Sequence, residues 1–141
     1  MIGAGYRRLS TPRAIRTFVL AGLAIGTVGV FLRWTTDAPV AVDGTEGPNN
    51  GWLVLLMVAF AAGWTRSLLR GSRTAVVAVT GAAVVIAWTA VENWRDGRLA
   101  MDAGASYGLL LVIGASVLLA SGAVLAAVRS IDRTPEEALQ P

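Results

Sequence analysis

Three carboxylates that lie close together in the chain, Glu92, Asp96 and Asp102, are the residues best suited to chemistry. Paired carboxylates can exchange protons with a substrate or hold a divalent cation. Arg95 and Arg98 lie among them, so ion pairing in a solvated loop accounts for the same residues without any activity. We predict a solvated loop and keep a lipid-acting enzyme that uses these carboxylates as a third hypothesis.

A second polar segment contains Asp43, Glu46, Asn49 and Asn50. These residue types could bind a cation, but an EF-hand loop needs its ligands at alternate positions and a glycine at the sixth. The segment lacks that spacing, and its Gly and Pro residues are equally typical of turns. We therefore predict no metal site in it.

The residue types that are missing exclude several kinds of chemistry. The chain has no His and no Cys, and all 12 basic residues are Arg. Disulfide frameworks, Cys or Cys/His metal sites, His acid–base catalysis and Schiff-base lysines are thereby excluded. We predict no catalytic residues, no metal and no cofactor.

The composition indicates a membrane protein. Of the 141 residues, 55% are hydrophobic and only 15% are charged, and the mean hydropathy is +0.61. Soluble domains are about 45–50% apolar and about 25% charged. Because so few polar side chains cannot cover a soluble particle of this size, the sequence predicts an integral membrane protein.

Four apolar stretches are long enough to cross a bilayer, which takes about 17–25 helical residues. None alternates with a period of two, and lipid cannot satisfy the open edge of a sheet. We therefore predict an all-α, integral membrane four-helix bundle that forms a single domain, 1–141. The predicted helices cover about 14–34, 52–69, 74–91 and 107–128, with outer loops 35–51 and 92–106 and a tight turn at Gly71 between the middle two.

The charges predict an orientation with both termini cytoplasmic. The side of the termini holds nine arginines and three acidic residues, a net charge of +6, whereas the other side has a net charge of −3. The positive-inside rule then places the termini in the cytoplasm. We interpret the arginines as topology and headgroup contacts, not as a nucleic-acid surface. The residues assigned to this role are Arg13, Arg16, Arg70, Arg73 and Arg129.

The aromatic residues agree with this layout, because Trp and Tyr favour the membrane–water interface. Their alternative role as an aromatic cage for a cation is less favoured. The predicted interfacial aromatics are Trp34, Trp52, Trp64, Trp88, Trp94 and Tyr107.

The first predicted helix has one competing interpretation. A basic start that includes Arg7 and Arg8, followed by an apolar run, resembles a secretory signal peptide. The run is longer than usual, and Pro39-Val40-Ala41 is a poor cleavage pattern. We expect the segment to stay as a helix; cleavage is the alternative.

Small residues recur in the apolar stretches, and small residues four apart let helices approach closely in lipid. We expect these positions to pack within the monomer. The alternative is that one face, with Gly22 and Gly26 as its strongest candidate, meets another protein. The predicted helix-packing residues are Gly22, Gly26, Gly29, Gly114 and Gly122.

The centres of the predicted spans carry no ionisable residue and no proline. Their polar groups are Thr27, Thr80, Ser116 and Ser121, and each hydroxyl can bond the carbonyl four residues earlier. Proton relays and coupled transporters usually need charges or broken helices at this depth. The pattern disfavours a coupled transporter, and a passive oligomeric pore remains an alternative.

The two hairpins align without a gap when the chain is shifted by 57 residues. Arg13, Arg16 and Thr17 then fall on Arg70, Arg73 and Thr74, and Gly51 falls on Gly108. A duplication would give a pseudo-twofold axis along the membrane normal. Chance similarity between two hairpins rich in Ala, Val and Leu is the alternative.

Three short segments form a recognisable pattern: Phe31-Leu32-Arg33-Trp34, Asp43-Gly44 through Asn50-Gly51-Trp52, and Tyr107-Gly108-Leu109. This pattern resembles a diffuse set of small four-helix membrane proteins of high-GC prokaryotes, actinobacteria and haloarchaea. Arg33 stands where proline is common in that set. The resemblance implies a layout and no activity.

The leading functional hypothesis is a non-enzymatic accessory or structural subunit of a larger membrane assembly, such as a respiratory or secretion complex. The expected location is the cytoplasmic membrane of a prokaryote, with a virion envelope as an alternative. The expected partners are the bilayer and other membrane proteins or a second copy, and no nucleic acid. A homo-oligomeric channel or passive carrier is the second hypothesis.

Overall fold

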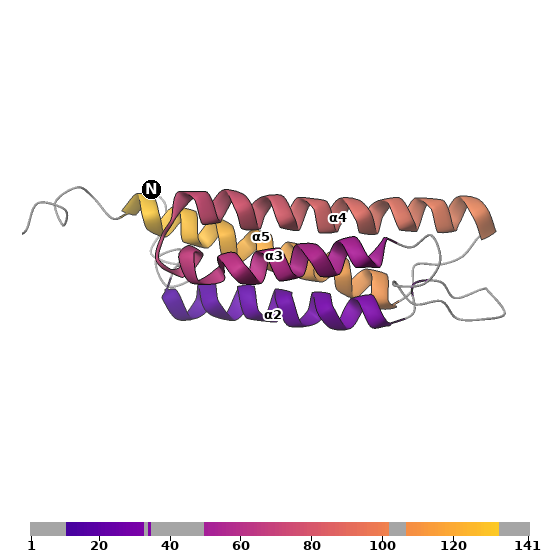
Figure 1. The fold of residues 1–141 in the computed structure, drawn as a ribbon, viewed down its shortest axis with the longest axis horizontal. Coiled ribbons are helices and arrows are strands. Elements are labelled where there is room, and N and C mark those ends of the chain that lie inside the picture. The colour runs from indigo at the N-terminus through magenta and orange to yellow at the C-terminus, as the bar shows by residue number, and fades with distance from the viewer. Residues whose placement is uncertain (1–10, 33, 35–49, 102–106, 133–141) are drawn as a thin grey trace, which may run out of the picture.

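A computed structural model describes residues 11–32, 34, 50–101 and 107–132, without the side chains of residues 96–101 and 132. This part of the chain forms four α-helices and no strand (Figure 1). The prediction of an all-α four-helix bundle is confirmed. The helices are α2 (Pro12–Phe31), α3 (Gly51–Leu69), α4 (Arg73–Met101) and α5 (Tyr107–Asp132).

The helices lie along one common direction, and consecutive helices are antiparallel (Figure 1). Helix α2 contacts α5 and α3, and α4 contacts the same two helices from the other side. α2 and α4 therefore occupy one diagonal of the bundle. The backbones of α2 and α5 make more close approaches than those of any other pair of these helices.

All four helices are long and apolar enough to cross a membrane. The candidate spans are Pro12–Phe31, Gly51–Leu69, Arg73–Arg95 and Tyr107–Ile131, with mean hydropathies between 1.6 and 2.5. Such a helix satisfies the backbone groups between its two ends within itself, which lipid requires. The chain is therefore a multi-pass membrane protein.

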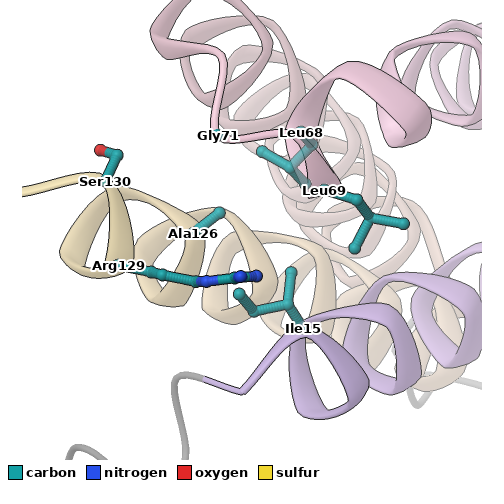
Figure 2. A pocket seen from close by; sticks show the side chains of 7 residues that line it. All are labelled: Ile15, Leu68, Leu69, Gly71, Ala126, Arg129 and Ser130. Atoms are coloured by element: carbon teal, nitrogen blue, oxygen red, sulfur yellow. The ribbon is translucent and has the colours of Figure 1, made fainter. Parts of the chain in front are cut away.

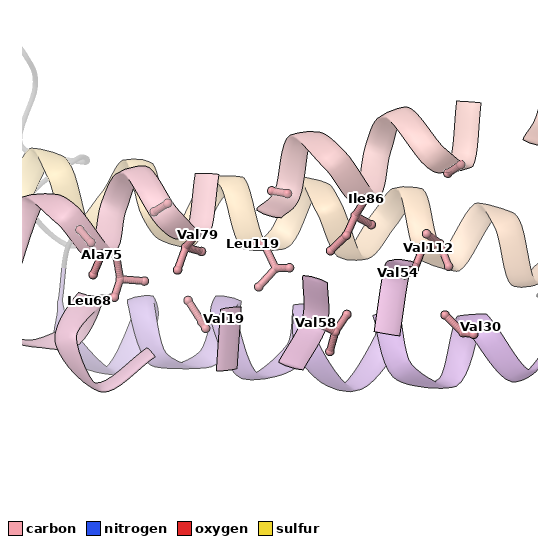
Figure 3. Close-up of a cluster of buried hydrophobic side chains, with 14 of the residues drawn as sticks. Val19, Val30, Val54, Val58, Leu68, Ala75, Val79, Ile86, Val112 and Leu119 are labelled. Atoms are coloured by element: carbon pink, nitrogen blue, oxygen red, sulfur yellow. The ribbon is translucent and has the colours of Figure 1, made fainter. Parts of the chain in front are cut away.

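The centre of the bundle is filled by branched apolar side chains (Figure 3). Val19 of α2, Val79 of α4 and Leu119 of α5 are fully buried there. Among the described residues, only Thr89 and Ser116 are buried polar ones. The interior is thus a packed apolar core along the whole bundle.

Local hydrogen bonds fix the turn between α3 and α4, which was predicted at Gly71. Gly71 has a φ of 85°, which favours glycine because it has no Cβ. Its N–H donates to the carbonyl of Leu68, and the N–H of Ser72 donates to the carbonyl of Ser67, the Schellman pattern. Ser72 also caps α4, because its Oγ accepts from the N–H of Ala75 at 3.4 Å. The prediction of a tight turn is confirmed.

Helix α4 is longer than its apolar stretch. It continues to Met101, whereas the sequence predicts an end at Val91 and a loop over 92–106. The prediction of a loop that begins at Glu92 is therefore wrong. Hydropathy marks only the part of a helix that lipid can cover, and Glu92 and Arg95 are both compatible with a helix in water.

Candidate functional site

The interface between α2 and α5 is built on glycines. A Cβ added to Gly22 would lie 2.9 Å from Cγ of Leu119 and 3.1 Å from the carbonyl oxygen of Ala115. A Cβ on Gly29 would lie 3.0 Å from the carbonyl oxygen of Gly108. These glycines therefore let the two backbones come closer than any larger residue would allow.

At one end of this interface, the glycine lies on α5 and the larger residue lies on α2. Gly122 belongs to α5, and a Cβ there would lie 2.7 Å from Cγ2 of Val19 on α2. Gly26, one turn beyond Gly22 on α2, meets Ala115 and Val58. All along this interface, the space beside each glycine is thus filled by a larger residue of a neighbouring helix.

Four of the five glycines predicted to pack helices lie in this interface, and Gly114 does not. A Cβ on Gly114 would meet nothing within 4 Å, so this glycine is not at a contact between the described helices. Gly22 and Gly26 face the inside of the protein. The alternative that they form a face for another protein is therefore wrong, because Leu119 and Val58 already occupy the space beside them.

Three of the four hydroxyl groups predicted to bond their own backbone, those of Thr27, Ser116 and Ser121, do so. Oγ1 of Thr27 donates to the carbonyl of Leu23 at 2.8 Å, and Oγ of Ser121 donates to that of Val117 at 2.7 Å, as predicted. Ser116 instead bonds the carbonyl three residues earlier, that of Ile113, at 2.7 Å. Each of these donors is satisfied inside the helix that carries it.

Arginine side chains gather at one end of the bundle. The first turns of α2 and α4 lie beside the last turns of α3 and α5, because the helices alternate in direction (Figure 1). This arrangement brings together residues that are far apart in the sequence. The described members are Arg13, Arg16, Arg66, Arg70, Arg73 and Arg129, and we call this region the arginine end.

A small cavity lies inside the arginine end (Figure 2). Ile15 of α2, Leu68 of α3 and Ala126 of α5 line it, and the side chain of Arg129 extends across it towards Ile15. The space open to water is about 10 Å³, near the minimum that holds one water molecule. This cavity is too small for a substrate.

Most of the predicted interfacial aromatics are exposed. The exposed fractions of Trp52, Trp88 and Tyr107 are 67%, 64% and 84%. Trp94 is also exposed, and Trp64 is partly buried, with its ring 6.2 Å from that of Phe60.

Trp34 differs from these aromatics, because its side chain is only 3% exposed. Its indole N–H donates to the carbonyl of Gly29 at 2.9 Å. That carbonyl is one of the last four of α2, which have no partner within the helix. Trp34 therefore caps the end of α2 from within the protein.

Of the carboxylates that could do chemistry, the structure describes the side chain of Glu92 alone. Glu92 is exposed on α4, Asp96 lies on the same helix without a described side chain, and Asp102 lies outside the described residues. Asp43 and Glu46 lie outside them as well. Within the part of the chain that is described, no three acidic residues come together as a metal ligand set.

The fold and its surfaces define a class: a multi-pass membrane protein built as a four-helix bundle with a solid apolar interior. Comparison with protein-family models, with curated proteins and with solved structures finds no match to this chain. The class therefore rests on the helices and their packing.

Sequence reasoning missed the residues that complete the interface between α2 and α5. Val19, Leu119 and Val112 fill the space beside the glycines, but they look like any other apolar residue in the sequence. One pattern could have found them. Steps of three or four residues forward from Val19 to Gly29 on α2 are matched by equal steps backward from Gly122 to Val112 on α5.

Proposed function

We propose that this protein is a non-enzymatic subunit of a larger membrane assembly and acts through contacts between helices. The observation that carries the proposal is the filled interior, in which the two buried hydroxyls described, those of Thr89 and Ser116, bond their own helices. The described core is filled by apolar side chains, and the cavity at the arginine end is too small for a substrate. Its outer surface is then the surface through which it acts.

Two outward positions on this surface suit a helix of another protein. Gly63 of α3 and Gly81 of α4 are exposed, and a Cβ on either would meet nothing within 4 Å. They are unlike Gly22 and Gly122, whose space is filled from within the bundle. A glycine open to lipid allows a partner helix to approach closely.

The test is the size of the protein particle after extraction into lipid nanodiscs without detergent exchange. We expect a mass well above the 14.7 kDa of one chain. Gly63→Leu and Gly81→Leu should reduce that mass while thermal unfolding stays unchanged. Leu20→Val, on the exposed face of α2, is the control that keeps the wild-type mass. A wild-type particle of a single chain would overturn the proposal.

We further propose that the termini and the arginine end face the cytoplasm of a prokaryotic cell. The support is the excess of arginine at that end, which the positive-inside rule assigns to the cytoplasm. The chain has no cysteine, so single-cysteine variants report without background. In intact cells, a membrane-impermeant maleimide should label Asn50→Cys and should label Arg70→Cys only after lysis. The reverse pattern would refute this orientation.

A further inference from the structure

A groove lies between the first turns of α4 and the last turns of α5, at the arginine end. Its walls are mostly apolar, and its volume is about 420 Å³. Val77 and Ile131 on its two sides are 72% and 73% exposed. The lining residues are Arg73, Val76, Val77, Ala127, Ser130 and Ile131.

The polar end of this groove is a guanidinium. Arg73 is the first residue of α4, and Val77 lies one turn further into the candidate span. Ser130 is the other polar residue of the lining, but its Oγ donates to the carbonyl of Ala127 at 2.7 Å. Arg73 is therefore the group available to bind an anion, and guanidinium matches the geometry of phosphate.

The charge around the groove favours an anionic ligand. Arg70 lies three residues before Arg73, and every charged side chain described at this end is an arginine. Asp132, whose side chain is not described, follows the groove at the end of α5. Basic pockets between transmembrane helices favour anionic headgroups.

We propose that this groove binds an anionic phospholipid, with one acyl chain along Val77 and Ala127, one turn further into the spans, and the phosphate on Arg73. The position of Arg73 at the end of a candidate span is where headgroups begin, and the walls below it are apolar. The proposal is independent of the assembly role, because it needs no partner protein.

A second groove shows why the arginine matters. It lies between α2 and α5 and has a similar volume of about 460 Å³. Its lining consists of Phe18, Val117, Ala120, Ser121, Val124 and Leu125, so it contains no charged residue. This groove can hold an acyl chain but has no charged group that could select a headgroup. It therefore provides a matched control.

The test is native mass spectrometry of the purified chain with dioleoylphosphatidylglycerol or dioleoylphosphatidylcholine. We expect one phosphatidylglycerol to bind more tightly than any phosphatidylcholine. Arg73→Gln should weaken phosphatidylglycerol binding about fivefold, since one arginine near a membrane surface contributes on this order. Val77→Trp should weaken it as well by filling the groove.

Two control variants and one headgroup probe complete the test. Arg95→Gln, on the part of α4 far from the arginine end, and Val124→Trp, in the second groove, should leave phosphatidylglycerol binding unchanged. Equal binding of the two lipids, or no effect of Arg73→Gln, would overturn the proposal. Glycerol phosphate that binds as tightly as the whole lipid would also overturn it, because the acyl chain would then contribute nothing.

Discussion

The interface between α2 and α5 and the interface between α3 and α4 join antiparallel helices by different means. Gly22, Gly26 and Gly29 line the first interface, and their space is filled by residues of neighbouring helices. A shift of 57 residues maps these glycines onto larger residues of α4. The matching residues are Val79, Ala83 and Ile86, which are all buried.

The difference teaches that glycine content does not decide how closely two helices approach. Helix α3 has Gly63 and, at its first residue, the buried Gly51, and the span of α4 has Gly81; Gly63 and Gly81 both point away from the bundle. The first pair approaches through its glycines, and the second is held by apolar side chains. The direction in which a small residue points, and not its presence, sets the packing.

The ends of the two corresponding helices differ as well. Helix α2 ends at Phe31, and Trp34 covers its last turn, whereas α4 continues to Met101. The 57-residue shift places Val91, which is 42% exposed, opposite the buried Trp34. The duplication itself stays a prediction, although both hairpins hold corresponding places in the bundle.

The largest expected effect comes from adding a methyl group inside the close-packed interface between α2 and α5. Gly22→Ala places a methyl group against both Leu119 and the backbone of Ala115, so the helices must move apart. We expect a loss of about 2–3 kcal/mol in the free energy of unfolding, typical of an overpacked core. Unfolding in mixed micelles with sodium dodecyl sulfate measures it. A stability equal to wild type would show that the interface is not close-packed.

The cap on α2 should give the next effect. Trp34→Phe keeps a ring in place but leaves the carbonyl of Gly29 without its donor. We expect a loss of about 1–2 kcal/mol, because a buried acceptor then lacks a partner. The same unfolding measurement applies, and Trp88→Phe, at an exposed position, is the matched control. If both variants lose the same stability, Trp34 is not a cap.

A double-mutant cycle tests whether the residues on the two sides of the interface are matched in size. Gly122→Ala brings a methyl group against Val19, and Val19→Ala removes the atom it would meet. We expect the double variant to lose about 1 kcal/mol less of the free energy of unfolding than the two single variants lose together. Additive effects would mean that the two positions do not touch.

The smallest effects belong to the outward glycines. Gly63→Ala, Gly81→Ala and Gly114→Ala add a methyl group where nothing lies within 4 Å. Alanine also favours a helix over glycine by up to about 1 kcal/mol. We expect unfolding of the isolated chain to be unchanged or slightly harder. A clear loss of stability at any of these positions would contradict the conclusion that only the inward glycines are needed for packing.

The sequence contained enough information to predict the four helices but not all of their limits. Long uncharged stretches such as 107–128 identify a membrane span, because a bilayer excludes charge over a fixed thickness. The end of α4 could not be found this way, since its last residues lie beyond the apolar stretch. Asp96 was expected in a loop for the same reason and lies on a helix.

The candidate site residues also include some whose placement the sequence predicts and some whose placement it does not. The gathering of Arg13, Arg70 and Arg129 at one end follows from the count and direction of the helices, so the sequence predicts it. The burial of Trp34 does not follow, because a tryptophan next to a span is equally typical of the membrane interface. Its hydrogen bond to Gly29 depends on how the chain turns after Phe31.

The sequence alone determined the class of this protein, because hydropathy and length are properties of each segment by itself. It also determined that hydroxyls such as those of Thr27 and Ser121 bond within their own helices, since a serine or threonine finds a carbonyl three or four residues earlier. Only the tertiary structure decided which glycines face inward. Gly22 and Gly63 occur in equally apolar stretches, and a helix must be rotated against its neighbours before either has a partner.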